Sequence, residues 1–301
     1  NYKVVLTGEG ADEFLGGYDI FKEAKVRRFW AQQPDSKWRH LLFKRLYPDI
    51  AHFTSQQSAM LAAFFRDGLA DLDSPYYSHA IRWRNTGRAR RFFSEALAAQ
   101  IQRELAVGKH HPPVPPDFMR WGPLERSQFL EVEVFLSEYL LSSQGDRPAM
   151  AHSVEGRYPF LDFRVVEFCN RLPARLKLRG LQEKYLLRLL GRELLPPEIW
   201  QRRKRPYRAP IHRSFFNDQT PDYVRELLSE DAIAQAGLFK PSAVAQLVHR
   251  VDQGARLGET DDMALAGILS SQLVHSQFIA HFNLQPPLSG RDDVKVCARS
   301  S

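Results

Sequence analysis

The sequence predicts an α/β protein whose visible part is mostly helical. The chain opens on a segment, Tyr2 to Thr7, that reads as a β-strand, because Val4, Val5 and Leu6 form the continuous apolar run of a buried parallel strand. Apolar residues then recur at helical spacing along most of the chain. With 301 residues, 44% of them hydrophobic, the chain can bury a sizeable core.

The first strand is the only clear β prediction. Because one strand does not make a sheet, we expect its partners upstream of Asn1 or in another chain. A chain that opens inside a strand also predicts a piece cut from a longer protein.

Three later segments have the spacing of amphipathic helices. The first covers about 123–141, the second follows the polar pair Gln182-Glu183, and the third starts at Thr260 to Met263. The apolar face of the first helix contains Phe129, Val132, Leu136, Tyr139 and Leu140. That of the second contains Tyr185, Leu186, Leu189 and Leu190, and that of the third contains Leu265, Ile268, Leu269, Leu273 and Val274.

The predicted domain organisation is one domain over residues 1–282 followed by a flexible tail. Prolines at 112, 113, 115 and 116 make the segment 108–116 a stiff connector inside this domain. Residues 283–301 are polar and contain prolines and a glycine, which is typical of a frayed terminus.

Composition bounds the class of protein. No run of about 18 apolar residues is present, so we expect no membrane span, and no signal peptide is visible. Cys169 and Cys297 form neither a zinc pattern nor a disulfide framework, which favours the reducing cytoplasm.

The net charge of +7 permits an anionic partner, and arginines at 82, 84, 88, 90 and 91 lie beside Trp83. We favour an ordinary helix with a solvated basic face over a nucleic-acid site, because apolar Phe92, Phe93 and Leu97 follow directly.

The first segment with chemical content is Thr7 to Glu13, followed by Gly16-Gly17-Tyr18. A strand that ends in Thr-Gly and turns into a helix exposes backbone N–H groups, which stabilise anions. Mg²⁺ commonly binds one or two carboxylates together with substrate phosphates, so Glu9 and Asp12 fit a metal-phosphate site. A helix with acidic residues in its first turn is the plain structural alternative.

The second segment, Gln144 to Asp162, alternates charged and apolar residues without clean periodicity. Its charged residues are costly to bury unless they are paired. Asp146-Arg147 and Glu155-Arg157 are therefore candidates for structural ion pairs as much as for a site.

The third segment joins Lys184, which we expect on a helix, to Lys204, which we expect in a loop between Pro196-Pro197 and Pro210. The lysine ammonium group is a compact charge suited to phosphate, and prolines restrict a loop to few shapes. A solvated basic loop is the alternative.

Together these segments resemble the synthetase domain of glutamine-dependent asparagine synthetases. The family's Ser/Thr-Gly-Glu-Gly-Ala/Ser-Asp-Glu and Gly-Gly-Tyr are met by Thr7 to Tyr18, and its Met-Ala-His…Arg-x-Pro-Phe-Leu-Asp by Met150 to Asp162. Its Lys-Tyr-x-Leu-Arg is met by Lys184 to Arg188, and its Arg-x-Lys loop by Arg202 to Pro210. The resemblance covers Tyr2 to about Phe278.

The chain departs from the family pattern at three points. Pro206-Tyr207 replaces the commoner Gly-Phe, and the family's Ser-Gly-Gly-x-Asp-Ser pyrophosphate loop is not in the sequence. The N-terminal glutaminase domain, which releases ammonia from glutamine, is absent too. We therefore expect this fragment to be inactive alone.

The resemblance implies a fold, a reaction and roles. The fold is an adenine-nucleotide α-hydrolase-like (PP-loop ATP pyrophosphatase), Rossmann-like domain. The parent is an ATP-dependent amide-forming ligase. It adenylates the aspartate side-chain carboxylate, and ammonia then displaces AMP to give asparagine. ATP and Mg²⁺ are the implied cofactors.

By motif position, the residues take the following roles. Thr7, Gly8 and Lys184 contact the nucleotide, with Lys184 facing pyrophosphate, and Asp12 binds the metal. The catalytic residues are Lys204, which lies nearest the reacting phosphorus, and Glu9, which is the base at the amide-forming step. Glu155 and Arg157 form part of the wall of the substrate pocket.

Three alternatives stay open. One is a related ligase that acts on another carboxylate, of the β-lactam-synthetase or natural-product kind. The second is a catalytically incomplete fragment that only folds or binds, and the third is a nucleic-acid-binding module.

Overall fold

The computed structural model describes residues 2–47, 54–106, 111–204, 211–217, 219–255 and 257–282. The chain divides into two compact units, described separately. Unit 1 contains residues 1–87 and 109–207, and unit 2 contains residues 88–108 and 208–301. The sequence predicts one domain over 1–282 instead. The predicted connector at 108–116 lies where the chain passes from unit 2 back to unit 1, and the predicted tail lies outside the described residues.

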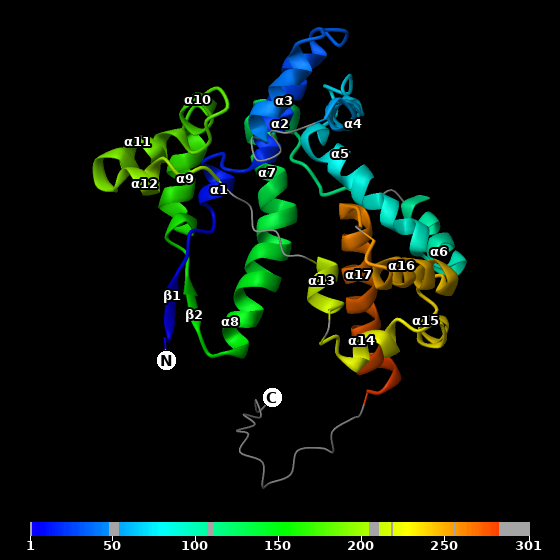
Figure 1. Ribbon diagram of the computed structural model, residues 1–301. Coiled ribbons are helices and arrows are strands. Elements are labelled where there is room, and N and C mark those ends of the chain that lie inside the picture. Colours follow the sequence, from blue (N-terminus) through cyan, green and yellow to red (C-terminus); the bar gives the residue numbers. More distant parts are fainter. Residues whose placement is uncertain are drawn as a thin grey trace. The chain divides into compact units, whose positions relative to one another are not determined.

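Unit 1 is built almost entirely of helices, with one short pair of strands at its edge (Figure 1). Its elements are β1 (Val4–Leu6), α1 (Ala11–Phe14), α2 (Asp19–Ala31), α3 (Phe43–Leu46), α4 (Ser55–Arg66), α5 (Tyr77–Thr86), α7 (Pro123–Glu131), α8 (Arg147–Ala151), β2 (Glu155–Arg157), α9 (Phe163–Arg171), α10 (Ala174–Lys177), α11 (Tyr185–Leu194) and α12 (Pro197–Trp200).

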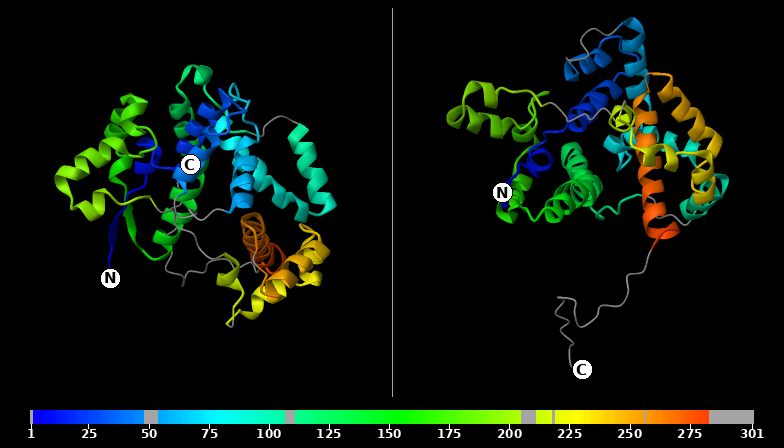
Figure 2. Two further views of the ribbon diagram at one scale, coloured as in Figure 1. Left: turned by 45° about the horizontal axis from the view of Figure 1, so that its top comes forward. Right: turned by 60° about the horizontal axis from the view of Figure 1, so that its bottom comes forward.

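The partner of the opening strand lies within the same chain. β1 pairs in parallel with β2, with Val4 opposite Glu155 and Leu6 opposite Arg157, and the two strands lie side by side in every view (Figures 1 and 2). The expectation that the partner lies upstream or in another chain is therefore wrong for this edge. Among the described residues the sheet has these two strands, and both are solvent-exposed along most of their length.

The helix predicted at 123–141 is longer than its apolar face indicates. α7 continues through a π-helical stretch, Val132–Asp146, directly into α8, and the three form the long green helix of Figures 1 and 2. Backbone hydrogen bonds therefore extend the helix to Ala151, past the point where the apolar pattern ends. The start after Gln182-Glu183 is confirmed by α11.

The core of unit 1 lies between α2, α3, α4 and α5. Its buried side chains are Val26, Trp30, Phe43, Leu46, Phe65, Leu69 and Ile81. The rings of Phe43 and Phe65 stack with their centroids 3.9 Å apart. This packing fixes α2, and the turn that precedes α2 carries the candidate site.

Unit 2 is helical and has its own core. Its helices are α6 (Glu95–Ala106), α13 (Ile211–Phe215), α14 (Asp222–Leu227), α15 (Glu230–Ala236), α16 (Pro241–Asp252) and α17 (Glu259–His275), which continues as a π-helical turn, Ser276–Ala280. The predicted start near Thr260 is confirmed by α17.

The helix over 259–280 is long and apolar enough to cross a membrane by length and composition. Leu265, Ile268 and Leu269 of this helix are buried in the unit 2 core, whereas Met263, Val274, Phe278 and Ile279 are exposed. Its buried Asp261 pairs with Arg91 and Arg250. Core packing of unit 2 thus accounts for part of the apolar composition of this helix, of which 28% is buried.

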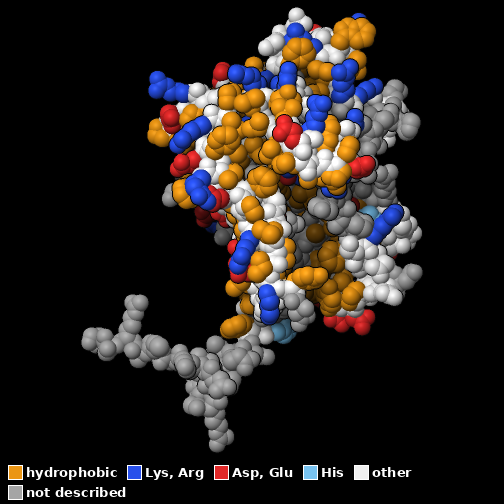
Figure 3. Space-filling model, turned by 90° about the vertical axis from the view of Figure 1, so that its left-hand side faces the viewer, with side chains coloured by type: hydrophobic (Ala, Val, Ile, Leu, Met, Phe, Trp, Pro, Cys, Tyr) orange, Lys and Arg blue, Asp and Glu red, His pale blue; other side chains and the backbone are white. Residues whose placement is uncertain are grey.

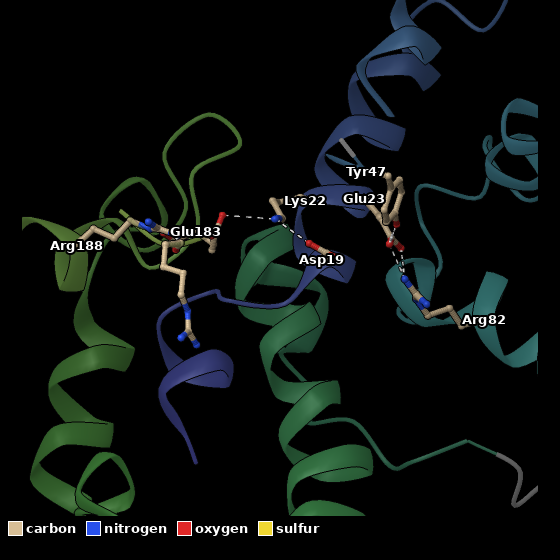
Figure 4. A network of polar contacts seen from close by, with 8 residues as sticks. Asp19, Lys22, Glu23, Tyr47, Arg82, Glu183 and Arg188 are labelled. Carbon is tan, nitrogen blue, oxygen red and sulfur yellow. Dashed lines mark hydrogen bonds and ion pairs between the residues drawn. The ribbon is translucent and has the colours of Figure 1, made fainter. Parts of the chain in front are cut away.

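Several arginines of the basic stretch 82–91 are held by carboxylates of the chain. Arg82 donates to both oxygens of Glu23, which is almost fully buried (Figure 4), and Arg84 donates to Asp67. Arg91 pairs with Asp261. These ion pairs favour the structural interpretation of this stretch over a phosphate-binding one.

Candidate active site

Asp12 joins two of the lysines that the sequence singles out. Its Oδ1 lies 3.0 Å from Lys184 Nζ, and its Oδ2 accepts a hydrogen bond of 2.8 Å from Lys204 Nζ. The three residues come from α1, from the residue before α11, and from the loop after α12. The structure therefore brings a predicted metal ligand and two predicted phosphate-binding lysines to one point.

The turn that carries Asp12 depends on a glycine in the left-handed region. Gly10 has a φ of +90° and precedes α1, and a Cβ there would lie 2.4 Å from Leu161 Cδ2. Leu161 belongs to the second sequence motif, so this contact packs the first motif against the second. α1 has only four residues and a small dipole, so the lysine charges, rather than the helix N-terminus that the sequence suggests, dominate the field at Asp12.

Gly17 makes the approach of Asp12 to Lys184 possible. A Cβ at this position would lie 2.0 Å from Asp12 Oδ1 and 2.4 Å from Lys184 Cε. Real Cβ atoms do not come that close, so a larger residue would force the ion pair apart. The second glycine of Gly16-Gly17-Tyr18 is thus required by the site rather than by the turn.

The sequence predicts that Lys184 is on a helix. The structure instead places it directly before one. It has a φ of +51° and occupies the N-cap position of α11. A non-glycine residue in this region is uncommon and costs roughly 1 kcal/mol or more. The neighbouring contacts that hold the conformation are those of Glu183 and Arg188.

Glu183, which directly precedes Lys184 in the sequence, is a buried carboxylate that binds two cations, Lys22 and Arg188 (Figure 4). It accepts from Lys22 at 3.4 Å and from Arg188 at 2.5 Å. Lys22 also pairs with Asp19 at 2.7 Å. Although burial acts to raise the pKa of Glu183, Lys22 and Arg188 lower it overall, so the carboxylate stays ionised.

Arg188 links this cluster to the loop that carries Lys204. Its guanidinium donates to the carbonyl oxygens of Trp200 at 2.9 Å and Arg202 at 3.1 Å. The Lys-Tyr-x-Leu-Arg motif therefore supplies one lysine directly and uses its arginine to hold the loop of the other. Lys204 lies in a loop, as the sequence predicts, and Pro206-Tyr207 fall outside the described residues.

A buried polar layer supports Asp12 from behind. The neighbouring Glu13 is 1% exposed, and its Oε1 accepts from the hydroxyl of Tyr18 at 2.7 Å. Gln128 of α7 donates to the Glu13 carbonyl and accepts from the buried ammonium of Lys177 at 3.1 Å. Burial raises the pKa of Glu13 and lowers that of Lys177, so the layer favours neutral forms.

Thr7, Gly8 and Glu9 lie between β1 and α1 and have unused capacity. The hydroxyl oxygen of Thr7 is buried with no hydrogen-bond partner among the described residues, and no atom lies within 4 Å of a Cβ built on Gly8. The carboxylate of Glu9 makes no ion pair or hydrogen bond within the described ranges. Its charge contributes to a raised pKa of Tyr158, a residue of the second motif.

Glu155 and Arg157 pair with each other on the surface. Arg157 Nε donates to Glu155 Oε1 at 2.7 Å, and both side chains are about 60% exposed on β2. Each shifts the pKa of the other toward its charged form. The structural ion pair considered for these residues is present, and neither has a polar contact with Asp12, Lys184 or Lys204.

The residues at Asp12 fit a metal that is shared with a ligand, rather than a site made of protein ligands alone. Among the described residues no group of three His, Cys, Asp or Glu side chains could hold a metal. Asp12 Oδ1 is buried, and apart from the Lys184 ammonium it has no hydrogen-bond donor. One carboxylate completed by waters and phosphate oxygens is the usual environment of Mg²⁺.

Four supporting residues were missed from the sequence or quoted without a role: Gly17, Tyr18, Gln128 and Lys177. The Gly-Gly pair is a usable signal for Gly17, because adjacent glycines often mark a close approach. Tyr18 follows it, and Lys204 Nζ lies 5.3 Å from the Tyr18 ring centroid. Gln128 and Lys177 lack a local signal, since their contacts are distant in sequence.

Comparison with known proteins adds independent findings. An amidase, chry2, of Gibberella zeae is 27% identical over 69% of this chain and 32% of its own length. The glutamine-hydrolyzing asparagine synthetase 1 of Bacillus subtilis is 24% identical over 75% of the chain and 34% of its own length. A putative asparagine synthetase of Mycobacterium tuberculosis is 28% identical over 93% of the chain and 40% of its own length.

The chain thus spans roughly a third to two fifths of these relatives. No solved structure matches it. A family model described as asparagine synthase matches residues 1–276, which include every residue of the Asp12 site. On this match, and on motifs that fold together around Asp12, the chain belongs to the asparagine synthase family.

Proposed function

We propose that this chain carries the ATP-consuming site of an amide-forming ligase that activates the side-chain carboxylate of aspartate. The observation that carries the proposal is the meeting of Lys184 and Lys204 on Asp12. Two ammonium groups on one carboxylate leave one net positive charge, which suits the phosphates of a nucleotide. The family match supports ligase chemistry, and the substrate is proposed here.

In the first step, an oxygen of the aspartate carboxylate attacks the α-phosphorus of ATP, and pyrophosphate leaves with the electrons of the broken P–O bond. Negative charge grows on the leaving oxygens, where Lys184 and Lys204 would stabilise it. Bound Mg²⁺ would supply further charge neutralisation. Asp12 would be its protein ligand once phosphates have taken over the lysines.

In the second step, ammonia attacks the activated acyl carbon, and AMP leaves. The attacking nitrogen must lose a proton, and a nearby carboxylate is the natural acceptor. Glu9 suits this role because its carboxylate has no other partner within the described residues and it follows Thr7-Gly8 directly. We propose that the ammonia comes from a glutaminase domain, as in the glutamine-hydrolyzing relatives.

A second candidate is a ligase that amidates a different carboxylate. This candidate is favoured by the two amidases, chry2 and chyE, which match at 27% and 24% identity, the same range as the synthetases. The Asp12 site does not discriminate between the two candidate functions, because in both it would contact the phosphates of ATP and not the carboxylic acid that is amidated.

The test measures pyrophosphate and amide in the same reaction, in the protein at its full natural length, with ATP, aspartate and ammonia. Lys204→Met should suppress aspartate-dependent pyrophosphate release by about a hundredfold or more, since one electrostatic donor typically contributes that much. Glu9→Gln should spare part of the pyrophosphate release and reduce asparagine more deeply. Lys44→Met, an exposed lysine without a polar partner among the described residues, is the control.

Three results would contradict parts of the proposal. If Glu9→Gln keeps both products in the wild-type ratio, Glu9 is not the proton acceptor. If aspartate never stimulates pyrophosphate release but another carboxylic acid does, the second candidate replaces the first. Full activity of Lys204→Met would reject the phosphate site itself.

A further inference from the structure

A small recess in unit 1 lies between α2, α5 and α7, apart from the Asp12 site. It contains about 230 Å³ of space, part of it open solvent, and its enclosed part has room for about one water-sized group. Two arginines and several hydroxyl groups line it: Arg28, Ser74, Ser78, Arg126 and Ser127. None of the residues around Asp12 takes part.

Arg126 is a buried guanidinium without a carboxylate partner. It is 8% exposed, and its hydrogen bond within the described residues goes to the sulfur of Met119, at 3.3 Å. A thioether sulfur is a weak, uncharged acceptor. The positive charge of Arg126 is therefore only partly compensated. A buried cation without a counter-charge costs free energy, which a bound anion would reduce.

Arg28 adds a second positive charge to the same recess. Its contacts are also with neutral groups: it lies over the Tyr77 ring, 5.5 Å from the centroid, and donates to the Leu72 carbonyl at 3.5 Å. Repulsion from Arg28 adds to burial in lowering the pKa of Arg126. Two like charges thus line the same recess.

Neither arginine forms an ion pair with a carboxylate among the described residues, and Asp71, like Arg28, acts on Tyr77. Asp73 attracts Arg126 but is exposed and forms no ion pair with it among the described residues. Glu125 bends back to Gly122, and its charge acts on Lys177. The recess is therefore positive, and a negative group from outside the chain would remove the deficit.

We propose that this recess binds one small inorganic anion between Arg28 and Arg126. The two guanidinium groups would donate to it, and the hydroxyl of Ser74, which accepts from Tyr76 N, still has its proton to donate. The other two serines already donate or pair within the chain, Ser127 to Pro123 and Ser78 with His79. The enclosed space holds about one water-sized group, so a monatomic anion such as chloride fits it best, and a phosphate would extend into the open part of the recess.

Such an anion would act on the packing of unit 1. Arg28 lies on α2, Arg126 on α7, and Ser74 just before α5, so one ion would bridge the three helices that surround it. It would replace repulsion by attraction at their junction. We therefore expect the stability of the protein to depend on the kind of anion present, at constant ionic strength.

The experiment uses the 301-residue protein and three salts of matched ionic strength: chloride, phosphate and the bulkier gluconate. Chloride binding is read from the line width of the chlorine NMR signal, and competition from its loss on adding phosphate. Arg126→Met and Arg28→Met are compared with Arg171→Met, an exposed arginine of α9 in the same unit. Thermal unfolding is followed in all three salts.

We expect excess line width in the wild type and in Arg171→Met, and at least about a tenfold weaker effect in the other two variants, as for one lost charged contact. In gluconate, Arg126→Met should be as stable as the wild type or more so, because the buried unpaired charge is gone. In chloride or phosphate only the wild type and the control should gain stability.

Equal line widths in all four proteins would overturn the proposal, since the binding would then be on the general surface. Absence of any effect of chloride and of phosphate on the wild type would overturn it too. A loss of stability in Arg126→Met that is equal in all three salts would show that the arginine is structural only. Competition by phosphate, or its absence, distinguishes the two anions once binding is established.

Discussion

The carboxylate of Asp12 is shared between the ammonium groups of Lys184 and Lys204. We expect this arrangement to determine how the three side chains respond to a bound ligand. In the free protein each lysine is partly neutralised, so neither is exposed as an isolated charge. A phosphate can take the lysines, and the carboxylate is then free to bind a cation. The same three side chains form ion pairs in the free protein, and in the proposed function they would also form the metal-phosphate site.

The first residue-scale prediction concerns Gly17, whose missing side chain permits the Asp12–Lys184 contact. Gly17→Ala places a methyl group 2.0 Å from Asp12 Oδ1, so the ion pair must open. We expect binding of magnesium pyrophosphate, measured by calorimetry, to weaken about tenfold or more, the effect of one lost charged hydrogen bond. Gly267→Ala is the control, since no atom lies within 4 Å of a Cβ there. Equal affinities in the two variants would contradict the steric argument.

The second concerns the proton on Glu13, whose pKa is raised by burial above its ordinary value of 4.5. As the pH rises above about 4.5, the unfolded chain loses this proton first, so the folded state loses stability until the pH passes the folded-state pKa. Glu13→Gln has no proton to lose. Its stability relative to the wild type should therefore increase with pH across this window, by up to about 1.4 kcal/mol per pH unit.

Urea unfolding at a series of pH values measures this difference. Glu193→Gln, an exposed residue of α11, is the matched control and should show no such slope. The difference in the free energy of unfolding between Glu13→Gln and the wild type is the deciding quantity. If it is constant above about pH 4.5, or decreases as the pH rises, the fold does not hold the Glu13 carboxyl group neutral.

At the scale of elements, Arg188 joins α11 to the end of α12 and to the loop after it, because it donates to the carbonyl groups of Trp200 and Arg202. Lysine cannot reproduce this forked geometry. Arg188→Lys should release the Lys204 loop and weaken pyrophosphate binding. In a double-mutant cycle, Lys204→Met should add little to this loss, because both changes remove the same ammonium group.

Arg192→Lys, on the exposed face of the same helix, controls for a general effect on α11. Fully additive losses in Arg188→Lys and Lys204→Met would mean that the two residues act independently, and the positioning role of Arg188 would be rejected.

The motifs predict which residues meet, and the elements show where sequence reasoning stops. Asp12, Lys184 and Lys204 were found because their types and spacing match a family pattern. The strand β2 was missed because Glu155-Gly156-Arg157 has no apolar alternation, since it is exposed rather than half-buried. Its pairing with β1 is parallel, and parallel strands are joined by long crossovers that no local signal marks.

The length of the helix after Pro123 was underestimated for a related reason. Beyond Leu141 it is held by backbone hydrogen bonds and not by a buried apolar face, so the pattern ends before the helix does. Similarly, Gln128 and Lys177 support the site through contacts distant in sequence, which one sequence does not reveal.

At the scale of the whole molecule, exposed apolar surface is the main departure from an ordinary globular unit. On β1, Val4, Val5 and Leu6 are 39%, 43% and 72% exposed. Helices α11 and α12 expose further leucines and Ile199, on the side of the molecule that Figure 3 shows. An exposed apolar strand with free backbone groups is a template for intermolecular pairing.

We therefore expect the 301-residue chain to aggregate through β1. Leu6→Lys should slow aggregation, followed by light scattering, while the thermal midpoint changes little, because the side chain is exposed. Met60→Lys, which removes an exposed apolar side chain from α4, should help less. If both variants slow aggregation equally, general hydrophobicity rather than the strand edge is responsible.

The most direct test of the Asp12 site compares pyrophosphate binding with and without Mg²⁺ in three proteins: the wild type, Lys204→Met and Asp12→Asn. We predict that Lys204→Met weakens binding in both conditions. Asp12→Asn should keep or improve metal-free binding, because it removes a negative charge from beside the lysines, but should lose the gain that Mg²⁺ gives the wild type. If Asp12→Asn instead loses metal-free binding in parallel with Lys204→Met, or if all three proteins bind alike, the three residues do not form a metal-phosphate site.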